Sequence, residues 1–471
     1  MVKLVNEQYA VSPGGGVWAE VVAQPRVVAQ LSRAAKVARA LIASGTLNDS
    51  GDAVSRGAIN SLAPHETTTP LNPETAAAGV KPTPGSDATP NPGADASQVA
   101  PPGVNLAAMT HAWLFVGPPG SGRSVAAKAF AAALVCEHPR ETGCGTCRQC
   151  EAVRKGIHPD VTVMTTELVQ VTVAEVKDLI RVAYQRPVRG AWRVIIVEDY
   201  DRVTEASSNV LLKAIEEPPE RTVWLLCAPS ASAVLPTIRS RCRLVQLAVP
   251  TASAVADLLV RRDEVEDPEL AAAVAGESGA HIGRARALAK NPELRARRLR
   301  MLETVAGMRS ASDACWTAAA LVKYVSLEAG ARQATDDEAE KSALLRSLGV
   351  NPDDPDFHPT REVKAQLKRL EESQKRRHKR LELDTWDRLL EDLGGFYRDA
   401  MVLDLGAKTA LQNQVLEPLI RRFIAQGNDA KTNIARLEAI RQARWHLMHN
   451  GQPTLTMEAL CLDLTAHKND V

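Results

Sequence analysis

The segment THAWLFVGPPGSGRS, residues 110–124, decides the fold, because an apolar stretch runs directly into a glycine-rich turn. Its second half has the G-x-x-x-x-G-x-[ST] spacing of a phosphate-binding loop, which lies between a buried strand and a helix. Residues 194–197 and 223–226 are short apolar runs bounded by charges or turns, as is typical of buried parallel strands. Strands that alternate with helices around such a loop predict a doubly wound α/β domain.

In a phosphate loop, backbone N–H groups converge on phosphate oxygens, a lysine reaches the β- and γ-phosphates, and a hydroxyl binds Mg²⁺. The candidate nucleotide-binding residues here are Gly117, Gly120, Gly122, Arg123 and Ser124. Arg123 stands where the motif has lysine and exchanges a compact ammonium for a wide, planar guanidinium. It could bind phosphate in a distorted pose or fill the site itself. A retained fold element that binds no ligand is the third interpretation.

The acidic pair after the strand at 194–197 is Glu198-Asp199, whereas ATPases of this kind usually have Asp-Glu. In the usual order the aspartate holds Mg²⁺ and the glutamate polarises the attacking water. Swapping them displaces each carboxylate by about one methylene, and a misplacement near 1 Å can cost roughly 100-fold in rate. Glu198 and Asp199 are therefore candidate ATP/Mg²⁺ ligands. We expect the ATPase activity of the chain itself to be weak or absent. The alternative is that the two acidic residues have a purely structural role and cap the loop that follows the strand.

Four of the eight cysteines fall within fifteen residues, as Cys136, Cys144, Cys147 and Cys150. The C-x7-C-x2-C-x2-C spacing places thiolates in tight turns. Four thiolates suit tetrahedral Zn²⁺ without an open position, so we expect a structural rather than a catalytic metal. Buried free cysteines are the alternative.

The whole-chain properties point to a protein of several domains. A chain of 471 residues is too long for one core. Its formal net charge of +1 provides no global attraction to nucleic acid or membranes. We see no signal peptide and no run of about 18 apolar residues, so we expect a cytoplasmic protein that does not contact membranes.

The order of elements predicts three domains. Residues 1–249 are expected to form the α/β domain, which begins with a helix within 17–40 and contains the zinc module at 136–150. Residues 44–104 are rich in Pro, Thr, Ala and Gly, and we expect them to form a disordered insertion in this domain. Residues 250–305 are expected to form a small helical lid, and residues 306–471 a longer all-helical oligomerisation domain. The charged stretch at 361–382 is either a solvated helix or a basic contact with nucleic acid.

Two further motifs follow the strand at 194–197. Thr204 can cap a helix that ends at Pro218-Pro219, and the segment LPTIRSRC, residues 235–242, brings Arg241 to the end of a short helix. A guanidinium that projects from a surface can act as an arginine finger on a neighbour's γ-phosphate. A surface salt bridge is the commoner role of any single arginine.

Several linked motifs together resemble bacterial clamp-loader AAA+ subunits, and among these the delta prime type. The motifs are HAWLFVGPPGSGRS, the four-cysteine module, HPDV (158–161), NVLLKAIEEPP (209–219), LPTIRSRC, FYRDAMVLDLGA (396–407) and LEAIRQARWHLMHN (437–450). The likeness leaves out residues 44–104 and roughly 330–375.

The resemblance implies a subunit of the heteropentameric clamp loader of DNA polymerase III, which places a sliding clamp on primed DNA. Its implied partners are the tau/gamma ATPase subunits, the delta subunit, the clamp and, through the assembled complex, primed DNA. The arginine finger of this family corresponds to Arg241, and its collar domain, which holds the ring of subunits together, corresponds to residues 306–471. The resemblance also implies that the subunit is a rigid stator of the ring. An ATP-hydrolysing motor subunit of the same loader and a zinc-stabilised repair or recombination ATPase are the alternatives. Within the lid sequence GAHIGRA (279–285) we expect Gly283, not Arg284, at the second sensor position.

Overall fold

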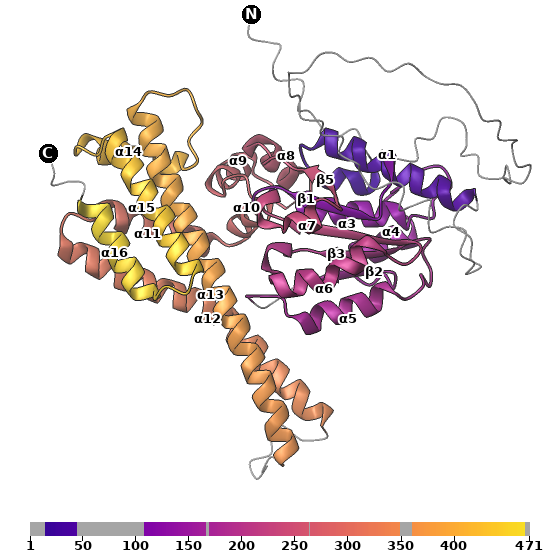
Figure 1. The fold of residues 1–471 in the computed structure, drawn as a ribbon. Coiled ribbons are helices and arrows are strands. Elements are labelled where there is room, and N and C mark those ends of the chain that lie inside the picture. The colour runs from indigo at the N-terminus through magenta and orange to yellow at the C-terminus, as the bar shows by residue number, and fades with distance from the viewer. Residues whose placement is uncertain (1–14, 45–107, 166–168, 263, 349–359, 467–471) are drawn as a thin grey trace, which may run out of the picture.

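The chain folds into an α/β domain, a small helical lid and a helical collar from which a long arm projects (Figure 1). This computed structural model describes residues 15–44, 108–165, 169–262, 264–348 and 360–466. The predicted insertion at 44–104 therefore lies, apart from Ser44, outside the described residues.

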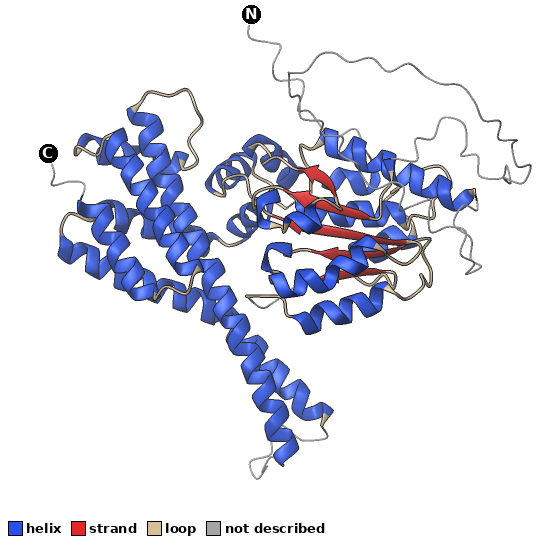
Figure 2. Cartoon of the chain, in the orientation of Figure 1, coloured by secondary structure: helices blue, strands red, loops and turns tan. Residues whose placement is uncertain are grey.

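The α/β domain is built on a five-stranded, fully parallel sheet in the order β2-β3-β4-β1-β5. The strands are β1 (Ala112–Val116), β2 (Val161–Met164), β3 (Arg193–Val197), β4 (Thr222–Ala228) and β5 (Arg243–Gln246). The residues of the three inner strands, β1, β3 and β4, are buried on both sides, which explains why the sequence has continuous apolar runs there. Figure 2 shows the sheet with helices on both faces.

The helices and short 3-10 turns of this domain lie in two layers. They are η2 (Gly16–Glu20), α1 (Pro25–Ala43), α3 (Arg123–Leu134), α4 (Arg148–Arg154), α5 (Val173–Ala183), η5 (Tyr200–Arg202), α6 (Glu205–Glu216), η6 (Ala231–Ala233) and α7 (Pro236–Arg239). Alternate side chains of β1 define the layers. Trp113 and Phe115 pack with α1 and α3, whereas Leu114 and Val116 pack with α5 and α6. The predicted doubly wound fold is confirmed.

The first helix begins later than the apolar pattern suggested. Residues 16–20 form the separate turn η2, and Ala23 has a φ of 55° that breaks the helical path. Pro25 then opens α1, because proline lacks the N–H group that a first-turn residue leaves unpaired.

The lid and the collar are helical, as predicted. The lid core comes from α8 (Ala252–Arg261), α9 (Pro268–Glu277) and α10 (Ile282–Lys290). The other helical elements are α11 (Pro292–Gly307), α12 (Ala311–Ser347), α13 (Arg361–Asp404), η7 (Gln414–Leu416), α14 (Glu417–Ala425), α15 (Ala430–Met448) and α16 (Pro453–Ala466). The second half of α11 packs into the collar core, so this helix crosses the border predicted at 305.

The arm is formed by the end of α12 and the start of α13, which project together from the collar (Figure 1). Arg377 of α13 forms ion pairs with Glu340 and Asp337 of α12, the second at 3.6 Å. Gln374 donates to the backbone oxygen of Asp337 at 3.1 Å. At about 1.5 Å per residue, α13 is roughly 66 Å long and runs from the arm into the collar. Within the described part of the chain, none of the helices is both long and apolar enough to cross a membrane.

Candidate functional site

The phosphate loop joins β1 to α3, the arrangement that its sequence motif requires. Gly120 and Gly122 have φ values of 82° and 85°, a left-handed conformation that side chains disfavour. Gly122 caps α3, whose N-terminal end points its free N–H groups toward the loop. His281 of the lid covers the loop so closely that a Cβ atom on Gly120 would lie 2.9 Å from its Cα.

The guanidinium of Arg123 bends back onto its own loop. Its Nη1 donates a hydrogen bond to the carbonyl oxygen of Gly117. A lysine in this position of a working loop points at phosphate oxygens instead. A cavity of about 340 Å³ remains between loop and lid, and it is lined by residues that include Ser124, Arg262, His281 and Arg286. Of the three interpretations that the sequence allowed, this geometry favours the one in which the side chain of Arg123 fills the phosphate-binding site.

Both acidic side chains after β3 are engaged in ion pairs. Glu198 accepts from Lys128 of α3 at 2.7 Å. Asp199 accepts from Arg380 of α13 at 2.8 Å, so a collar helix reaches the end of the sheet. A carboxylate held by a cation of the same chain is less available to a metal ion, because the cation must first be displaced.

The lid places its two candidate sensor residues differently. Gly283 lies beside the loop cavity together with His281. Arg284 points away from the loop, toward Asp392 and Glu391 of α13, with 3.7 Å to the latter. Burial lowers the pKa of His281, so a neutral imidazole covers the loop.

Arg241 lies in the turn between α7 and β5 with 40% of its side chain exposed. Its Nε is 2.5 Å from Glu216 Oε1 at the end of α6, and its Nη1 donates to Thr237 O at 2.8 Å. The expected cap of α6 is present, since Thr204 Oγ1 accepts from Ser207 N at 3.2 Å. Glu216 thus has the cationic partner that an acid at a helix C-terminus needs.

The four cysteines converge on one point beside α3, with their sulfur atoms all within 4.8 Å of one another. Sγ of Cys136 lies 3.8 Å from Sγ of Cys144 and 4.0 Å from Sγ of Cys147. Tetrahedral thiolate–zinc bonds of about 2.3 Å place sulfurs about 3.8 Å apart, so the cluster fits a metal ion. A hydrogen bond from Cys150 lowers the pKa of Cys136, which favours the thiolate form that binds metals.

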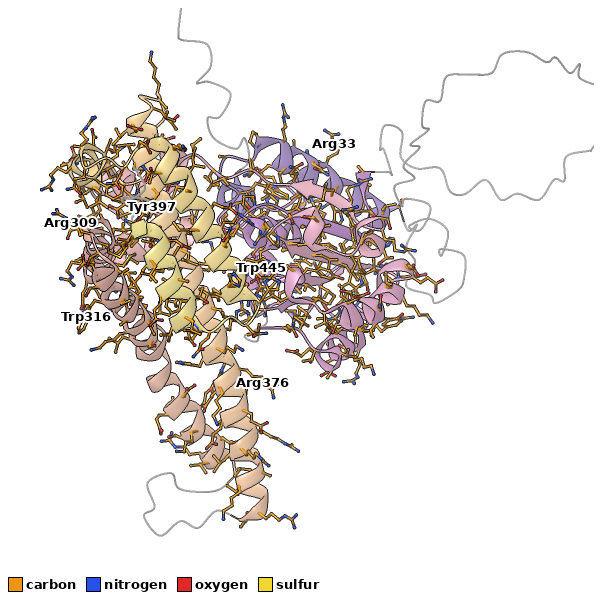
Figure 3. All side chains as sticks on the ribbon, turned by 60° about the vertical axis from the view of Figure 1, so that its left-hand side comes forward. Arg33, Arg309, Trp316, Arg376, Tyr397 and Trp445 are labelled. Carbon is orange, nitrogen blue, oxygen red and sulfur yellow. The ribbon has the colours of Figure 1, made fainter. Side chains whose placement is uncertain are left out.

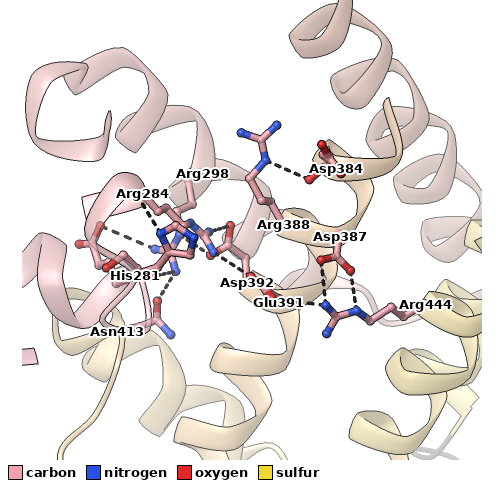
Figure 4. Close-up of polar contacts among 12 residues, drawn as sticks. His281, Arg284, Arg298, Asp384, Asp387, Arg388, Glu391, Asp392, Asn413 and Arg444 are labelled. Carbon is pink, nitrogen blue, oxygen red and sulfur yellow. Dashed lines mark hydrogen bonds and ion pairs between the residues drawn. The ribbon is translucent and has the colours of Figure 1, made fainter. Parts of the chain in front are cut away.

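A network of charges joins the lid and the collar (Figure 4). Arg298 of α11 is buried, and its Nε donates to Asp392 Oδ1 at 2.6 Å. Its Nη2 donates to Asn413 Oδ1 at 2.6 Å and to the backbone oxygen of Glu277 at 3.3 Å. Five residues earlier on α13, Asp387 accepts from Arg444 of α15 and ties two collar helices together. These contacts hold lid and collar as one unit.

Sequence reasoning did not assign Lys128, His281 or Arg380 to this site. Lys128 belongs to no motif with a fixed spacing, and His281 lies in the lid sequence GAHIGRA, where only Gly283 and Arg284 were considered. Arg380 lies within the charged stretch at 361–382, where nothing local distinguishes it from its neighbours. Only the path of α13 along the end of the sheet shows that Arg380 meets Asp199.

Comparison with known proteins agrees with this geometry. The family model described as DNA polymerase III, delta subunit, matches residues 103–251. The delta prime subunit of Pseudomonas aeruginosa is 38% identical over 151 residues, which is 31% of this chain and 45% of that protein. The Escherichia coli delta prime subunit is 33% identical over 178 residues, which is 36% of this chain and 53% of that one. The chain thus spans about half the length of these relatives.

A gamma/tau subunit and a solved structure also match parts of the chain. The gamma/tau subunit of Mycobacterium tuberculosis is 35% identical over 135 residues, 28% of this chain and 23% of that one. A gamma subunit-related protein of Thermotoga maritima, a solved structure, is 15% identical and covers 76% of this chain and 94% of its own, with a TM-score of 0.32. The structural score is too low to add an argument.

The parallel sheet, phosphate loop and helical lid define the AAA+ class of nucleotide-switch proteins. The family match over residues 103–251 and the curated relatives named delta prime subunits then support the narrower resemblance seen in the sequence, to the delta prime type of DNA polymerase III subunit.

The junction between lid and collar gives a prediction on stability. Replacing Arg298 by methionine leaves Asp392 with Arg284 as its remaining cation but removes the donor to the oxygens of Asn413 and Glu277, and leaving a buried polar group unsatisfied costs about 1–3 kcal/mol. We expect urea unfolding, followed by circular dichroism, to show a loss of this size.

Arg300→Met, at an exposed position on the same helix, is the control and should change stability by about 0.5 kcal/mol or less. Equal losses in both variants would show that the buried network does not hold the junction.

Proposed function

We propose that this chain is a delta prime-type stator of a DNA polymerase III clamp loader. It helps to load the sliding clamp onto primed DNA, and it supplies an arginine finger to a neighbouring ATPase subunit. One observation carries the proposal: the loop arginine and both acidic residues are paired at the site itself, whereas Arg241 is 40% exposed and pairs with the similarly exposed Glu216 at the surface.

The proposed partners follow from the relatives, which are named as delta prime and gamma/tau subunits. We therefore place the tau/gamma ATPases, the delta subunit, the clamp and primed DNA around this chain in the cytoplasm. The collar, residues 306–471 in the domain division we favour, is the proposed contact with the other subunits. Its exposed Trp316 and Trp445 are visible in Figure 3.

The surroundings of Arg241 suit a group that acts on another molecule. Its pair with Glu216 is about 40% exposed on both sides, and exposed ion pairs contribute little stability, so the guanidinium can exchange partners at low cost. A γ-phosphate on a neighbour offers more negative charge than one carboxylate. Glu216 closes the helix that begins at Thr204, so this helix is the proposed relay from DNA or clamp to the finger.

Arg241→Ala tests the finger directly. In the reconstituted loader we expect the variant subunit to assemble normally, whereas ATP hydrolysis at the adjacent site falls by roughly 10³-fold, the lower range for such fingers. Single-turnover hydrolysis with DNA and clamp present measures this step.

The matched control is Arg239→Ala, which removes an exposed arginine two residues away whose Nη1 contacts only the carbonyl of Ala231 in this structure, at 3.4 Å. An unchanged rate in the Arg241 variant, or an equal loss in both variants, rules out the finger. DNA-dependent ATPase activity of the isolated chain would instead identify a motor subunit.

The phosphate loop is proposed to bind nucleotide weakly, because Arg123 occupies it. Arg123→Lys removes the fork that reaches Gly117, so we expect affinity for a fluorescent ADP analogue to rise about tenfold or more, that is by about 1.4 kcal/mol. Fluorescence titration of the isolated chain measures it. The control is Arg262→Lys, in the same cavity but outside the loop, which should leave the affinity for the ADP analogue unchanged. Tighter binding by the Arg262 variant without tighter binding by the Arg123 variant would contradict the assignment.

Zinc is the metal we propose for the four cysteines, with a structural role. Purified protein should contain one Zn²⁺ per chain by elemental analysis, and Cys144→Ser with Cys147→Ser should remove it and lower the melting temperature. Cys315→Ser, at an exposed cysteine outside the cluster, is the control and should retain the metal. Full zinc content in the double variant would show that the metal lies elsewhere.

A further inference from the structure

The arm carries a row of cations that neither the fold nor the proposed function uses. We define the basic stripe as Arg361, Lys364, Lys368, Arg369, Lys375 and Arg376, all of them exposed on α13. We propose that the basic stripe binds the phosphate backbone of duplex DNA outside the nucleotide-switch domain.

The stripe lies on the outward face of the arm. The inward face has Val363, Leu367, Leu370, Gln374 and Arg377 at alternating spacings of four and three, the pattern of a helix packed along a partner helix. These inward residues are buried or half-buried, and Arg377 forms the ion pairs with α12. The stripe residues occupy the remaining, mostly opposite positions and face solvent.

The stripe cations are not required to hold the arm together. Arg361, Lys364, Lys368, Arg369 and Lys375 form no ion pair with another residue that the structure describes, and Arg376 has only Glu372 at 4.0 Å. Like charges three or four residues apart destabilise a helix, so clustering them opposes folding. The whole chain has a formal net charge of only +1, so the chain without the six stripe cations has a net charge of −5, and the stripe is a local concentration of positive charge.

The chemistry of the stripe fits a polyanion better than a protein surface. Protein interfaces have an apolar or aromatic core, yet among the described residues from 328 to 404 no large apolar side chain is exposed. Sequence-independent DNA binding, in contrast, is supplied by Lys and Arg contacts to phosphates.

Duplex DNA fits better than a single strand for two reasons. Single-strand binding relies on aromatic side chains on which bases stack, and no Phe, Tyr or Trp is exposed on the part of the arm that the structure describes. The stripe is also a straight, helical element roughly 22 Å long at about 1.5 Å per residue, comparable to several base pairs along a duplex edge. Figure 3 shows Arg376 on the arm, away from the α/β domain.

The base of the arm gives the stripe a fixed position. Arg380 and Asp384, directly after the stripe, form ion pairs with Asp199 and Arg202 at 2.8 and 3.0 Å. DNA held by the stripe therefore lies beyond the end of the sheet that carries the phosphate loop. The inference goes beyond the proposed function and does not depend on loader assembly.

The test uses the full chain alone and a fluorescein-labelled 20-base-pair duplex, with anisotropy measured from about 50 to 200 mM salt. Four glutamines at 364, 368, 369 and 375 (K364Q, K368Q, R369Q, K375Q) preserve helix propensity and remove four charges. We expect affinity at the lowest salt to fall about tenfold or more. The slope of log K against log salt should become shallower by roughly two to four, since each phosphate contact contributes about 0.9.

The control removes four exposed cations from the α/β domain instead, as R26Q, R33Q, K36Q and K177Q, so the net charge is matched. Arg33 lies on α1, far from the arm (Figure 3). Circular dichroism confirms folding of both variants. Equal losses in the two variants, unchanged binding in the arm variant, or no duplex binding by the wild type at the lowest salt overturns the proposal.

Two further probes decide the class of ligand. Tighter binding of oligo(dT) than of duplex contradicts a duplex site. Capture of poly-glutamate in place of DNA, lost in the arm variant, identifies an acidic protein surface as the ligand and overturns the inference.

Discussion

The ion pair between Asp199 and Arg380 is the contact on which the arrangement of the molecule depends. It joins the end of the central sheet to the longest helix of the collar, across 181 residues of sequence. The neighbouring pair of Arg202 with Asp384 repeats the same connection at 3.0 Å. Ion pairs of this kind fix orientation because two charged groups must meet at a defined distance.

The charged groups at the phosphate loop and after β3 are likewise paired within the chain. Asp199 is held by the collar, Glu198 by Lys128, and the loop carbonyl of Gly117 by Arg123. In an ATPase that changes shape, such groups exchange partners during the cycle. Here each has a partner from its own chain, which favours one fixed shape.

A helix can serve several domains at once when its faces are chemically distinct. Along α13, the exposed cations near Arg361 come first, then the residues that meet the α/β domain, and last the segment from Trp386 to Ala400, in which Asp392 faces the lid and the apolar residues pack in the collar core. Each segment contacts a different layer of the protein. The buried Arg298, with partners from α9, α13 and the loop before η7, closes the junction at its centre.

Much of this protein was determined by local sequence. The apolar runs around THAWLFVGPPGSGRS predicted the parallel sheet, because strands covered on both sides must be apolar throughout. The capping residue Thr204 and the spacing of the four cysteines predicted their own geometry, since such contacts span a few residues. What the sequence could not decide was the partner of each charge: the direction of Arg123, the meeting of Arg380 with Asp199, and the inward or outward face of the arm. Those depend on segments brought together only by folding, and a charged side chain has no local pattern that specifies which distant charge it will meet.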